Sequence, residues 1–288
     1  MDDDDLRTLI ARATEFDGTP PFSDGALLEL AQGKRRLVWE TDGTGTRIGA
    51  ALDSPTAAEF VIDPDARGKG HGSRMLDMLT HPARHGAGAA KLFWAHGDHP
   101  AARILAEHHR LVAERELLHL EAEVPTETVG EISTSSIRLE TSSIRLETRS
   151  IRLGEGAEED AAELLDLNAR AFVDHPDQGD LSRADLDLLM AAPWFDAEDL
   201  RLLRDDAGTL IGFVWLKVDE FYVVAVSPER QGEGLGRKLM DVGFARLASK
   251  GIQRTHLYVE GDNAPALALY RALGFTDAGL GVQYHYTR

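Results

Sequence analysis

The sequence predicts an α/β protein built from two tandem lobes, and three observations carry this prediction. The length of 288 residues fits two domains of ordinary size. Segments rich in β-branched and aromatic residues alternate with amphipathic helical patterns, as is typical of α/β folds. Two stretches of the first half recur in the second half at one constant separation, which indicates a duplication.

The constant separation is 164 residues, and it holds at two sites that lie far apart along the chain. The recurring positions are, in pairs, Asp63 and Ser227, Pro64 and Pro228, Arg67 and Gln231, Gly70 and Gly234, Gly72 and Gly236, Trp94 and Tyr258, Gly97 and Gly261, and Asp98 and Asp262. We therefore expect a first lobe at residues 1–125, a linker at 126–150 and a second lobe at 151–288.

The linker contains a repeat of its own, because Ser-Ile-Arg-Leu begins at Ser136, Ser143 and Ser150. A spacing of seven suits a coiled coil, but isoleucine and leucine are two residues apart within each copy, which is the strand period. A helix is therefore the poorer interpretation. We interpret the segment as a locally duplicated linker, with a binding element as the alternative. Only residues 151–153 are expected to join the first strand of the second lobe.

The second lobe shows a regular order of elements. Leu235, Leu239 and Val242 are spaced four and three apart, which predicts one face of a helix, and Gly274 marks the end of another. The expected elements are a helix at 160–172, strands at 210–218 and 221–226, a helix opening near 235, a strand at 256–259, a helix at 264–273 and a closing strand at 282–286.

Composition limits the function. The chain has 31 basic and 49 acidic side chains, a net charge of −18, which argues against binding nucleic acid or an anionic membrane. The absence of cysteine excludes disulfides, thiolate metal sites and a cysteine nucleophile. His108 and His109 have no acidic partners at ligand spacing, so no metal site is expected.

Four aspartates follow Met1, unlike a secretory signal, and no apolar run approaches about 18 residues. We expect a cytoplasmic monomer that acts on a small molecule.

The glycine-rich segment from Gln231 to Gly236 follows a hydrophobic strand and opens a helix. Glycines allow a tight turn, and the free amides of a helix N-terminus attract anions such as a pyrophosphate. The alternative is a simple turn. A Rossmann site is disfavoured because the loop lies deep within the lobe, and a P-loop is excluded because no Gly-Lys-Ser/Thr follows. Arg230, Arg237 and Lys238 place positive charge here, either for phosphates or merely in solvent.

These features together resemble the GNAT acetyltransferase superfamily. The shared pattern is a strand, Arg/Gln-x-x-Gly-x-Gly opening a helix, then a strand followed by Asn263 and a helix that bears Tyr270 before Gly274-Phe275. The strings at 93–97, 175–179 and 257–260 resemble more closely the tandem-lobe mycothiol synthase family. The resemblance implies two lobes, each with a mixed, mostly antiparallel twisted sheet flanked by helices. It also implies transfer of acetyl from acetyl-CoA to the cysteinyl amine of cysteinyl-glucosaminyl-inositol.

The resemblance assigns the chemistry to two residues. Glu220 matches the acid that removes the proton of the amine, and Tyr270 matches the phenol that protonates the departing thiolate. From the residues alone, Glu220 also fits a solvated strand-end acid, and Tyr270 a core aromatic. At the 164 offset Ala106 stands opposite Tyr270, and no acid matches Glu220. The reaction is therefore expected in the second lobe, with the first lobe non-catalytic.

The same resemblance implies the coenzyme contacts. In the second lobe they are Val224, Ala225, Val226, Gln231, Gly232, Glu233, Gly234, Leu235, Gly236, Arg237, Asn263, Ala264, Pro265, Ala266, Leu267 and Ala268. In the first lobe, where acetyl-CoA would bind without turnover, they are Phe60, Val61, Ile62, Gly68, Lys69, Gly70, His71, Gly72 and Ser73. Asn263 fits a helix cap equally well.

The acceptor would be held by polar side chains that bond to sugar and inositol hydroxyls. The implied residues are Asp24, Asp177, Lys217, Glu220 and Tyr258. Asp24 and Asp177 stand where the family pattern has glutamate, which shortens their reach, and Lys217 alternatively faces solvent. Two other functions stay open: acetylation of another small amine or a protein N-terminus, and a non-catalytic acyl-CoA sensor.

Overall fold

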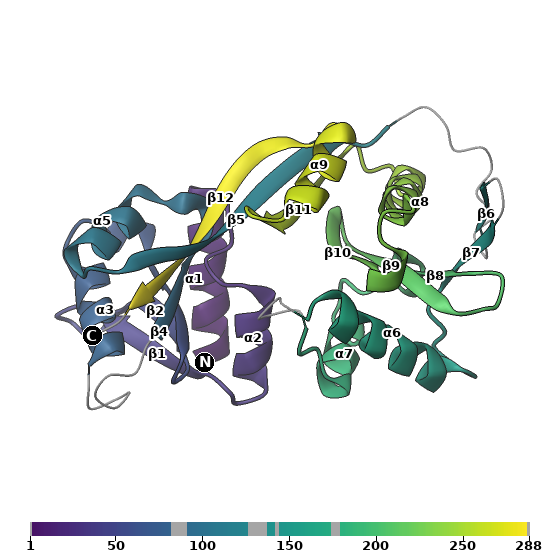
Figure 1. Cartoon of the computed structure of the whole chain (residues 1–288). Helices are drawn as coiled ribbons and strands as arrows, with labels where there is room; N and C mark the ends of the chain where they lie inside the picture. The colour runs from purple at the N-terminus through teal and green to yellow at the C-terminus, as the bar shows by residue number, and fades with distance from the viewer. Residues whose placement is uncertain (1, 82–90, 126–136, 142–143, 174–178, 287–288) are drawn as a thin grey trace. The chain divides into compact units, whose positions relative to one another are not determined.

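The computed structural model describes residues 2–81, 91–125, 137–141, 144–173 and 179–286, and the chain forms two compact units (Figure 1). The first unit comprises residues 1–119, 260–262 and 278–288, and the second comprises residues 120–259 and 263–277. The units are therefore not consecutive along the chain, because most of the last strand, β12 (Thr276–Tyr286), belongs to the first unit. The lobe boundaries at 125 and 151 stay predictions.

The first unit is a mixed sheet with helices on both faces. Its strands are β1 (Arg36–Thr41), β2 (Arg47–Asp53), β3 (Ala57–Ile62), β4 (Lys91–Ala95), β5 (Val112–Glu123) and the end of β12, in the order β1-β2-β3-β4-β12-β5. Only β3 and β4 are parallel among the pairs from β1 to β12. The helices are α1 (Asp2–Asp17), α2 (Asp24–Ala31), α3 (His71–Thr80) and α5 (Pro100–His108), with short turns η1 (Pro64–Ala66) and η2 (His96–Asp98). Helices α1 and α2 pack on one core cluster and α3 on another.

The second unit repeats this plan. Its strands are β6 (Ile137–Thr141), β7 (Ile144–Ser150), β8 (Leu200–Arg204), β9 (Leu210–Lys217), β10 (Glu220–Val226) and β11 (Arg254–Glu260), in the order β11-β10-β9-β8-β7-β6. The pairs from β6 to β10 are antiparallel, and β10 and β11 are parallel. The helices are α6 (Ala157–Ala171), α7 (Arg183–Met190), α8 (Leu235–Ser249) and α9 (Ala264–Ala272), with turns η3 (Ala197–Asp199) and η4 (Pro228–Arg230).

The predicted elements of the second lobe are confirmed in type. Their bounds agree with the predicted bounds to within a few residues, except that the closing strand begins at Thr276 and not at 282. Helix α7 and strand β8 were not predicted, since elements of eight and five residues give weak periodic signals. Among the described residues, none of the helices is both long and apolar enough to cross a bilayer.

Two apolar layers hold the second sheet. On one face α6 and α7 bury Leu164, Leu167 and Leu186 against β8, β9 and β10. On the other face Phe221 of β10 packs edge to face against Phe244 of α8, with ring centroids 5.1 Å apart. A Cβ at Gly243 would lie 2.2 Å from the Phe221 ring, so this position of α8 requires glycine. This close packing fixes α8, and with it the glycine loop that precedes the helix.

The duplication extends to the backbone. Helices α3 and α8 begin 164 residues apart, and so do α5 and α9. Gly68 and Gly70 have φ of +73° and +83°, and their counterparts Gly232 and Gly234 have +83° and +77°. The two lobes therefore share one loop conformation, which only glycine adopts without strain. The tandem duplication is confirmed.

The Ser-Ile-Arg-Leu repeat is a hairpin in its described part, so the preference for the strand period over a helix is confirmed. Strand β6 pairs with β7 in antiparallel register, and β7 pairs with β8. The expectation that residues 151–153 form the first strand was wrong, because the strand ends at Ser150 and Leu153 is exposed. The strand instead contains residues of the second copy, and Leu146 of that copy and Thr148 just after it alternate into the core.

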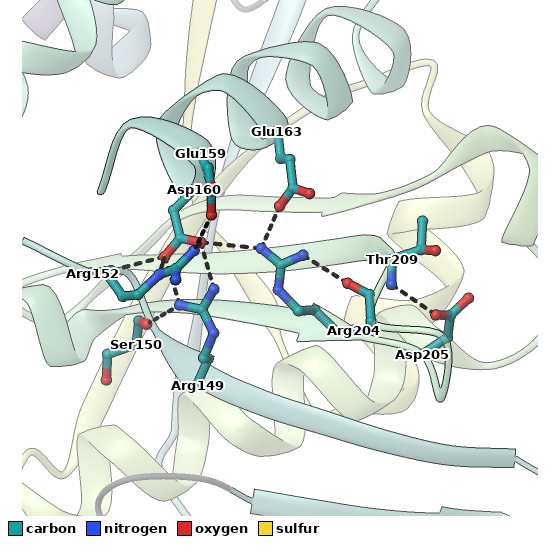
Figure 2. A network of polar contacts seen from close by, with 10 residues as sticks. Arg149, Ser150, Arg152, Glu159, Asp160, Glu163, Arg204, Asp205 and Thr209 are labelled. Atoms are coloured by element: carbon teal, nitrogen blue, oxygen red, sulfur yellow. Dashed lines mark hydrogen bonds and ion pairs between the residues drawn. The ribbon is translucent and has the colours of Figure 1, made fainter. Parts of the chain in front are cut away.

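A buried carboxylate explains why the chain takes this register (Figure 2). Asp160, at the start of α6, is fully buried and accepts hydrogen bonds from Arg149 at 2.6 Å and from the Arg152 backbone at 3.0 Å. Arg204 of β8 donates to it at 3.1 Å. Burial opposes ionisation, but the hydrogen bonds from Arg149 and Arg152 prevail and lower the pKa of Asp160. Arg149 lies shortly after the second copy and Arg152 is the arginine of the third copy, so the carboxylate anchors the end of the repeat.

Candidate active site

The parallel strands β10 and β11 are paired at one register position only, between Glu220 and His256. A register shift follows in β10 between Phe221 and Val223, which is the signature of a β-bulge. Beyond Glu220 the edge of β10 that faces β11 therefore has no register partner among the described strands. Such an edge can accept another extended chain by backbone hydrogen bonds.

The free edge lies at the residues that the resemblance implied. Ser227 donates its backbone N–H to the carbonyl of Ile211 at 2.9 Å, so Ser227 and Ala225 direct their backbone groups toward β9. Alternation along the strand then directs the backbone N–H and C=O groups of Val224 and Val226 to the opposite edge. The backbone of Val224 and Val226 thus fits an amide-bearing ligand, whereas Ala225 is buried and turned away.

The glycine loop presents an open helix N-terminus. Gly234 is the N-cap of α8, no side chain caps the helix, and its first turn has no acidic residue. The first-turn N–H groups are thus not satisfied by a side-chain cap and carry the partial positive charge of the helix. A Cβ at Gly236 would lie 3.2 Å from a methyl group of Leu269, so glycine also permits close approach of α8 and α9. The loop fits a pyrophosphate.

The three basic residues near the loop differ. Arg230 donates to both carboxylate oxygens of Glu233, at 2.9 and 3.0 Å, and lies 3.6 Å from Asp205. Its charge is therefore already balanced by acids. Arg237 and Lys238 form no ion pair with any residue that the structure describes. Of the positive charges expected to meet phosphates, only Arg237 and Lys238 stay available.

Tyr270 lies in α9, where its ring contacts Phe275 at a centroid distance of 5.8 Å. The side chain is half-buried, and burial raises the pKa of its phenol to about 12. Its hydroxyl has no hydrogen-bond partner within the described ranges of the chain. At neutral pH the phenol is therefore protonated and able to donate its proton, as general acid catalysis requires.

Glu220 is the first residue of β10 and is half-buried. It stands opposite Lys217 of β9 and opposite His256 of β11. His256 was not singled out from the sequence, because only the pairing of β10 with β11 brings it to Glu220. Burial lowers the pKa of His256 against the opposing effect of Asp219, so the imidazole is neutral at pH 7 and able to accept a proton.

The expected acceptor residues are only partly brought together. Lys217 ends β9 and Tyr258 is exposed on β11, both in the second unit with Glu220. Asp24 begins α2 in the first unit, and Asp177 lies outside the described residues. Among the residues whose positions are given, no cluster of three or more metal-ligating side chains is present.

Asn263 has a defined structural role. Its side-chain oxygen accepts the backbone N–H of Ala266 at 3.2 Å, so Asn263 is the N-cap of α9. The capping interpretation is confirmed, and the coenzyme contacts implied for 263–268 stay a prediction.

In the first lobe, the corresponding loop has a different environment. His71 lies 2.9 Å from Glu40, and Lys69 donates to the carbonyl of Asp65 at 2.9 Å. Helix α3 again has an uncapped N-terminus at Gly70. A Cβ at Gly72 would lie 3.0 Å from Leu105, the counterpart of the Gly236 and Leu269 contact. The anion-binding geometry of the loop is thus retained in both lobes.

Comparison with known proteins agrees with this geometry. Residues 161–275 match the acetyltransferase (GNAT) family model. A mycothiol acetyltransferase of Clavibacter michiganensis is 42% identical over 282 residues, covering 95% of this chain and 88% of that protein. A mycothiol acetyltransferase of Kytococcus sedentarius is 39% identical, covering 96% and 91%.

Solved structures support the fold. A tandem GNAT protein from the clavulanic acid biosynthesis pathway aligns with a TM-score of 0.66 at 16% identity, covering 97% of this chain and 93% of that chain. A GCN5-related N-acetyltransferase from Sphaerobacter thermophilus aligns with a TM-score of 0.64 at 17% identity, covering 98% and 91%. The expected mixed, mostly antiparallel sheets flanked by helices are confirmed.

Proposed function

The chain belongs to the mycothiol acetyltransferase family of GNAT enzymes, and we propose that its second lobe acetylates the cysteinyl amine of cysteinyl-glucosaminyl-inositol with acetyl-CoA, giving mycothiol and CoA. The single observation that supports this best is the parting of β10 and β11 directly after Glu220. It leaves a free strand edge between an acidic residue and an uncapped helix N-terminus.

The donor is proposed to bind along this edge. The backbone of Val224 and Val226 pairs with the amides of the pantetheine arm, as an added strand would. The loop from Gln231 to Arg237 holds the pyrophosphate through helix N–H groups. Residues 263–268 flank the arm near the thioester. The coenzyme supplies an activated acetyl group, and the protein supplies its position.

The proton transfers are assigned to Glu220 and Tyr270. The acceptor amine enters as an ammonium ion, which has no lone pair, so Glu220 removes a proton directly or through water. The amine nitrogen then attacks the thioester carbon and forms a tetrahedral intermediate. Its collapse forms the amide and breaks the C–S bond. The departing thiolate takes the proton of the Tyr270 hydroxyl, the amide nitrogen loses its second proton to solvent, and the Tyr270 phenolate regains a proton from solvent.

The remaining assignments complete the proposal. Asp24, Asp177, Lys217 and Tyr258 contact the hydroxyls of the acceptor. The first lobe binds acetyl-CoA through Phe60, Val61, Ile62 and residues 68–73 without turnover, because Ala106 stands where the second lobe has Tyr270. The protein acts as a monomer in the cytoplasm and needs no metal.

The test offers acetyl-CoA with one acceptor at a time and measures release of the CoA thiol. Cysteinyl-glucosaminyl-inositol is expected to be acetylated, and an aminoglycoside and a peptide with a free N-terminus are expected to react far more slowly. Activity confined to the peptide or to the aminoglycoside would contradict the proposed acceptor. Binding of acetyl-CoA with no turnover on any amine would support an acyl-CoA sensor instead.

A further inference from the structure

A cluster of aromatic rings in the second unit is not explained by the assignments above. Trp215 of β9 and Tyr222 of β10 pack edge to face, with ring centroids 5.6 Å apart. Trp194, in the segment between α7 and η3, lies 5.8 Å from Tyr222 and 5.9 Å from Trp215. Trp215 is buried, whereas Trp194 and Tyr222 are half-buried.

Two of these rings bind a lysine. The ammonium nitrogen of Lys217 lies 5.6 Å from the ring centroid of Trp194 and 5.7 Å from that of Tyr222. Both distances lie within the range of a cation–π interaction, which extends to about 6 Å. A lysine side chain has four rotatable bonds and otherwise samples many positions in water. Two rings around one ammonium therefore restrict where its charge is held.

Lys217 lies opposite Glu220 in the sheet. Lys217 and Glu220 are register partners on adjacent antiparallel strands, so their side chains leave the same face of the sheet. Trp215 is two residues before Lys217 on the same strand and faces the same way. The aromatic cluster, the ammonium and the carboxylate thus share one face of the sheet.

We propose that Trp194 and Tyr222 are positioning residues of the acceptor site. Their rings hold the Lys217 ammonium on the face of the sheet that it shares with Glu220, where it donates to hydroxyls of a hydroxyl-rich amine acceptor. This inference rests on the proposed function and adds to it the residues that select a polyhydroxylated acceptor over a simple amine.

The first test is a split of kinetic constants in the full chain. Trp194→Leu and Tyr222→Leu are each expected to raise the KM for cysteinyl-glucosaminyl-inositol about tenfold, with the KM for acetyl-CoA changed less than about twofold. Tyr222→Phe keeps the ring face, so it is expected to recover most of the acceptor affinity that Tyr222→Leu loses. A lower melting temperature with an unchanged acceptor KM would overturn the proposal, since it would show a structural role only.

A double-mutant cycle tests whether the rings act through the lysine. Adding Trp194→Leu to Lys217→Met is expected to raise the acceptor KM by less than about twofold beyond Lys217→Met alone, because the two changes remove one interaction. Fully additive effects would overturn the proposal. Trp39→Leu is the matched control, because the Arg47 guanidinium lies 4.6 Å from the Trp39 ring in the first unit. It is expected to leave the acceptor KM unchanged.

The outcomes separate this inference from the proposed function. A wild-type chain that does not acetylate cysteinyl-glucosaminyl-inositol contradicts both. A wild-type chain that acetylates it, while the two leucine variants keep the wild-type acceptor KM, overturns only the role of Trp194 and Tyr222.

Discussion

The two lobes share a loop and a helix but differ in the strand pair beside them. In the first lobe the parallel strands β3 and β4 are paired at three register positions, from Ala57 with Leu92 to Glu59 with Trp94. In the second lobe the equivalent strands are paired only between Glu220 and His256. The edge of β10 is therefore free over most of its length. The strand edges therefore differ at the start of the strand, whereas residues 60–62 and their counterparts 224–226 lie beyond the last register partner in both lobes.

The side chains near these strand edges also differ between the two lobes. In the first lobe Arg67 donates to the carbonyl of Ile62 at 2.9 Å and forms two hydrogen bonds to Asp17, at 2.6 and 2.7 Å. Its counterpart in the second lobe, Gln231, is exposed. The carbonyl at the end of β3 thus has a side-chain donor. Ligand access to this strand edge is expected to be poorer in the first lobe than in the second.

A further contrast lies at the position of Lys217. The equivalent residue of the first lobe is Asp53, which is buried and forms an ion pair with the buried Lys91. Burial lowers the pKa of Lys91, and the hydrogen bond to Asp53 opposes this. The first lobe therefore uses this position for an internal ion pair, and the second lobe uses it for a half-buried cation.

The largest expected effect is on catalysis. Glu220→Ala is expected to lower kcat/KM for the acceptor by about 10²- to 10⁴-fold, because proton removal from the ammonium loses its base. Steady-state thiol release measures the rate, and isothermal titration calorimetry is expected to show unchanged acetyl-CoA affinity. Thr56→Ala, at the equivalent first-lobe position, is the control and is expected to leave the rate unchanged. Equal losses in both variants would end the functional contrast between the lobes.

The next effect is on stability. Asp160→Asn is expected to lower the free energy of unfolding of the second unit by about 3 kcal/mol, because it removes the buried carboxylate that Arg149, Arg152 and Arg204 share. Glu163→Gln is the control, because Glu163 is exposed and, within the described part of the chain, pairs with Arg204 alone. It is expected to cost less than about 1 kcal/mol in urea unfolding.

The pKa of Asp160 predicts the pH dependence of this contribution. Because the pKa is lowered in the folded state, the stabilisation is present above the unfolded value of about 3.9 and is lost as the pH falls through the folded value. Wild-type stability should therefore decrease more than that of Asp160→Asn on acidification below about pH 4. Parallel pH profiles of the two chains would refute this assignment.

The same substitution at two equivalent glycines, Gly234 and Gly70, tests whether the two loops have the same role. Gly234→Ala introduces a Cβ at a φ of +77°, a conformation that costs a non-glycine residue roughly 1 kcal/mol or more. The distorted loop is expected to raise the KM for acetyl-CoA about tenfold, by the conversion of 1.4 kcal/mol per factor of ten. Gly70→Ala, at a φ of +83°, is expected to leave kinetic constants unchanged. If Gly70→Ala raises this KM equally, the lobes are coupled in turnover.

The smallest expected effect concerns alkaline pH. Because burial raises the pKa of Tyr270 to about 12, its phenol stays protonated through the ordinary alkaline range. The rate at saturating substrates should therefore show no decrease up to about pH 10, beyond any loss of folded protein. A descending limb with an apparent pKa near 9 that disappears in Tyr270→Phe would disprove the assigned environment.

Many features of the fold could be predicted from the sequence alone. The 164-residue offset, the glycine loops and the alternation of strands and helices all depend on local properties, since positive φ, caps and periodicity are set by neighbours along the chain. They predicted the α/β class, the duplication and the uncapped start of α8. The chain also carried enough family pattern to indicate Glu220 and Tyr270.

Other features were decided only by the tertiary structure, because pairing and burial depend on residues that are far apart in sequence. The parting of β10 from β11, the burial that raises the pKa of Tyr270 and the rings around Lys217 are of this kind. The hydrogen bonds by which Asp160 anchors the repeat also depend on residues far apart in sequence. The strand there ends at Ser150 and does not include residues 151–153, contrary to the expectation from the sequence. A hydrophobic pattern shows that a strand exists, whereas its partner and the point where pairing stops are set by contacts that no local pattern encodes.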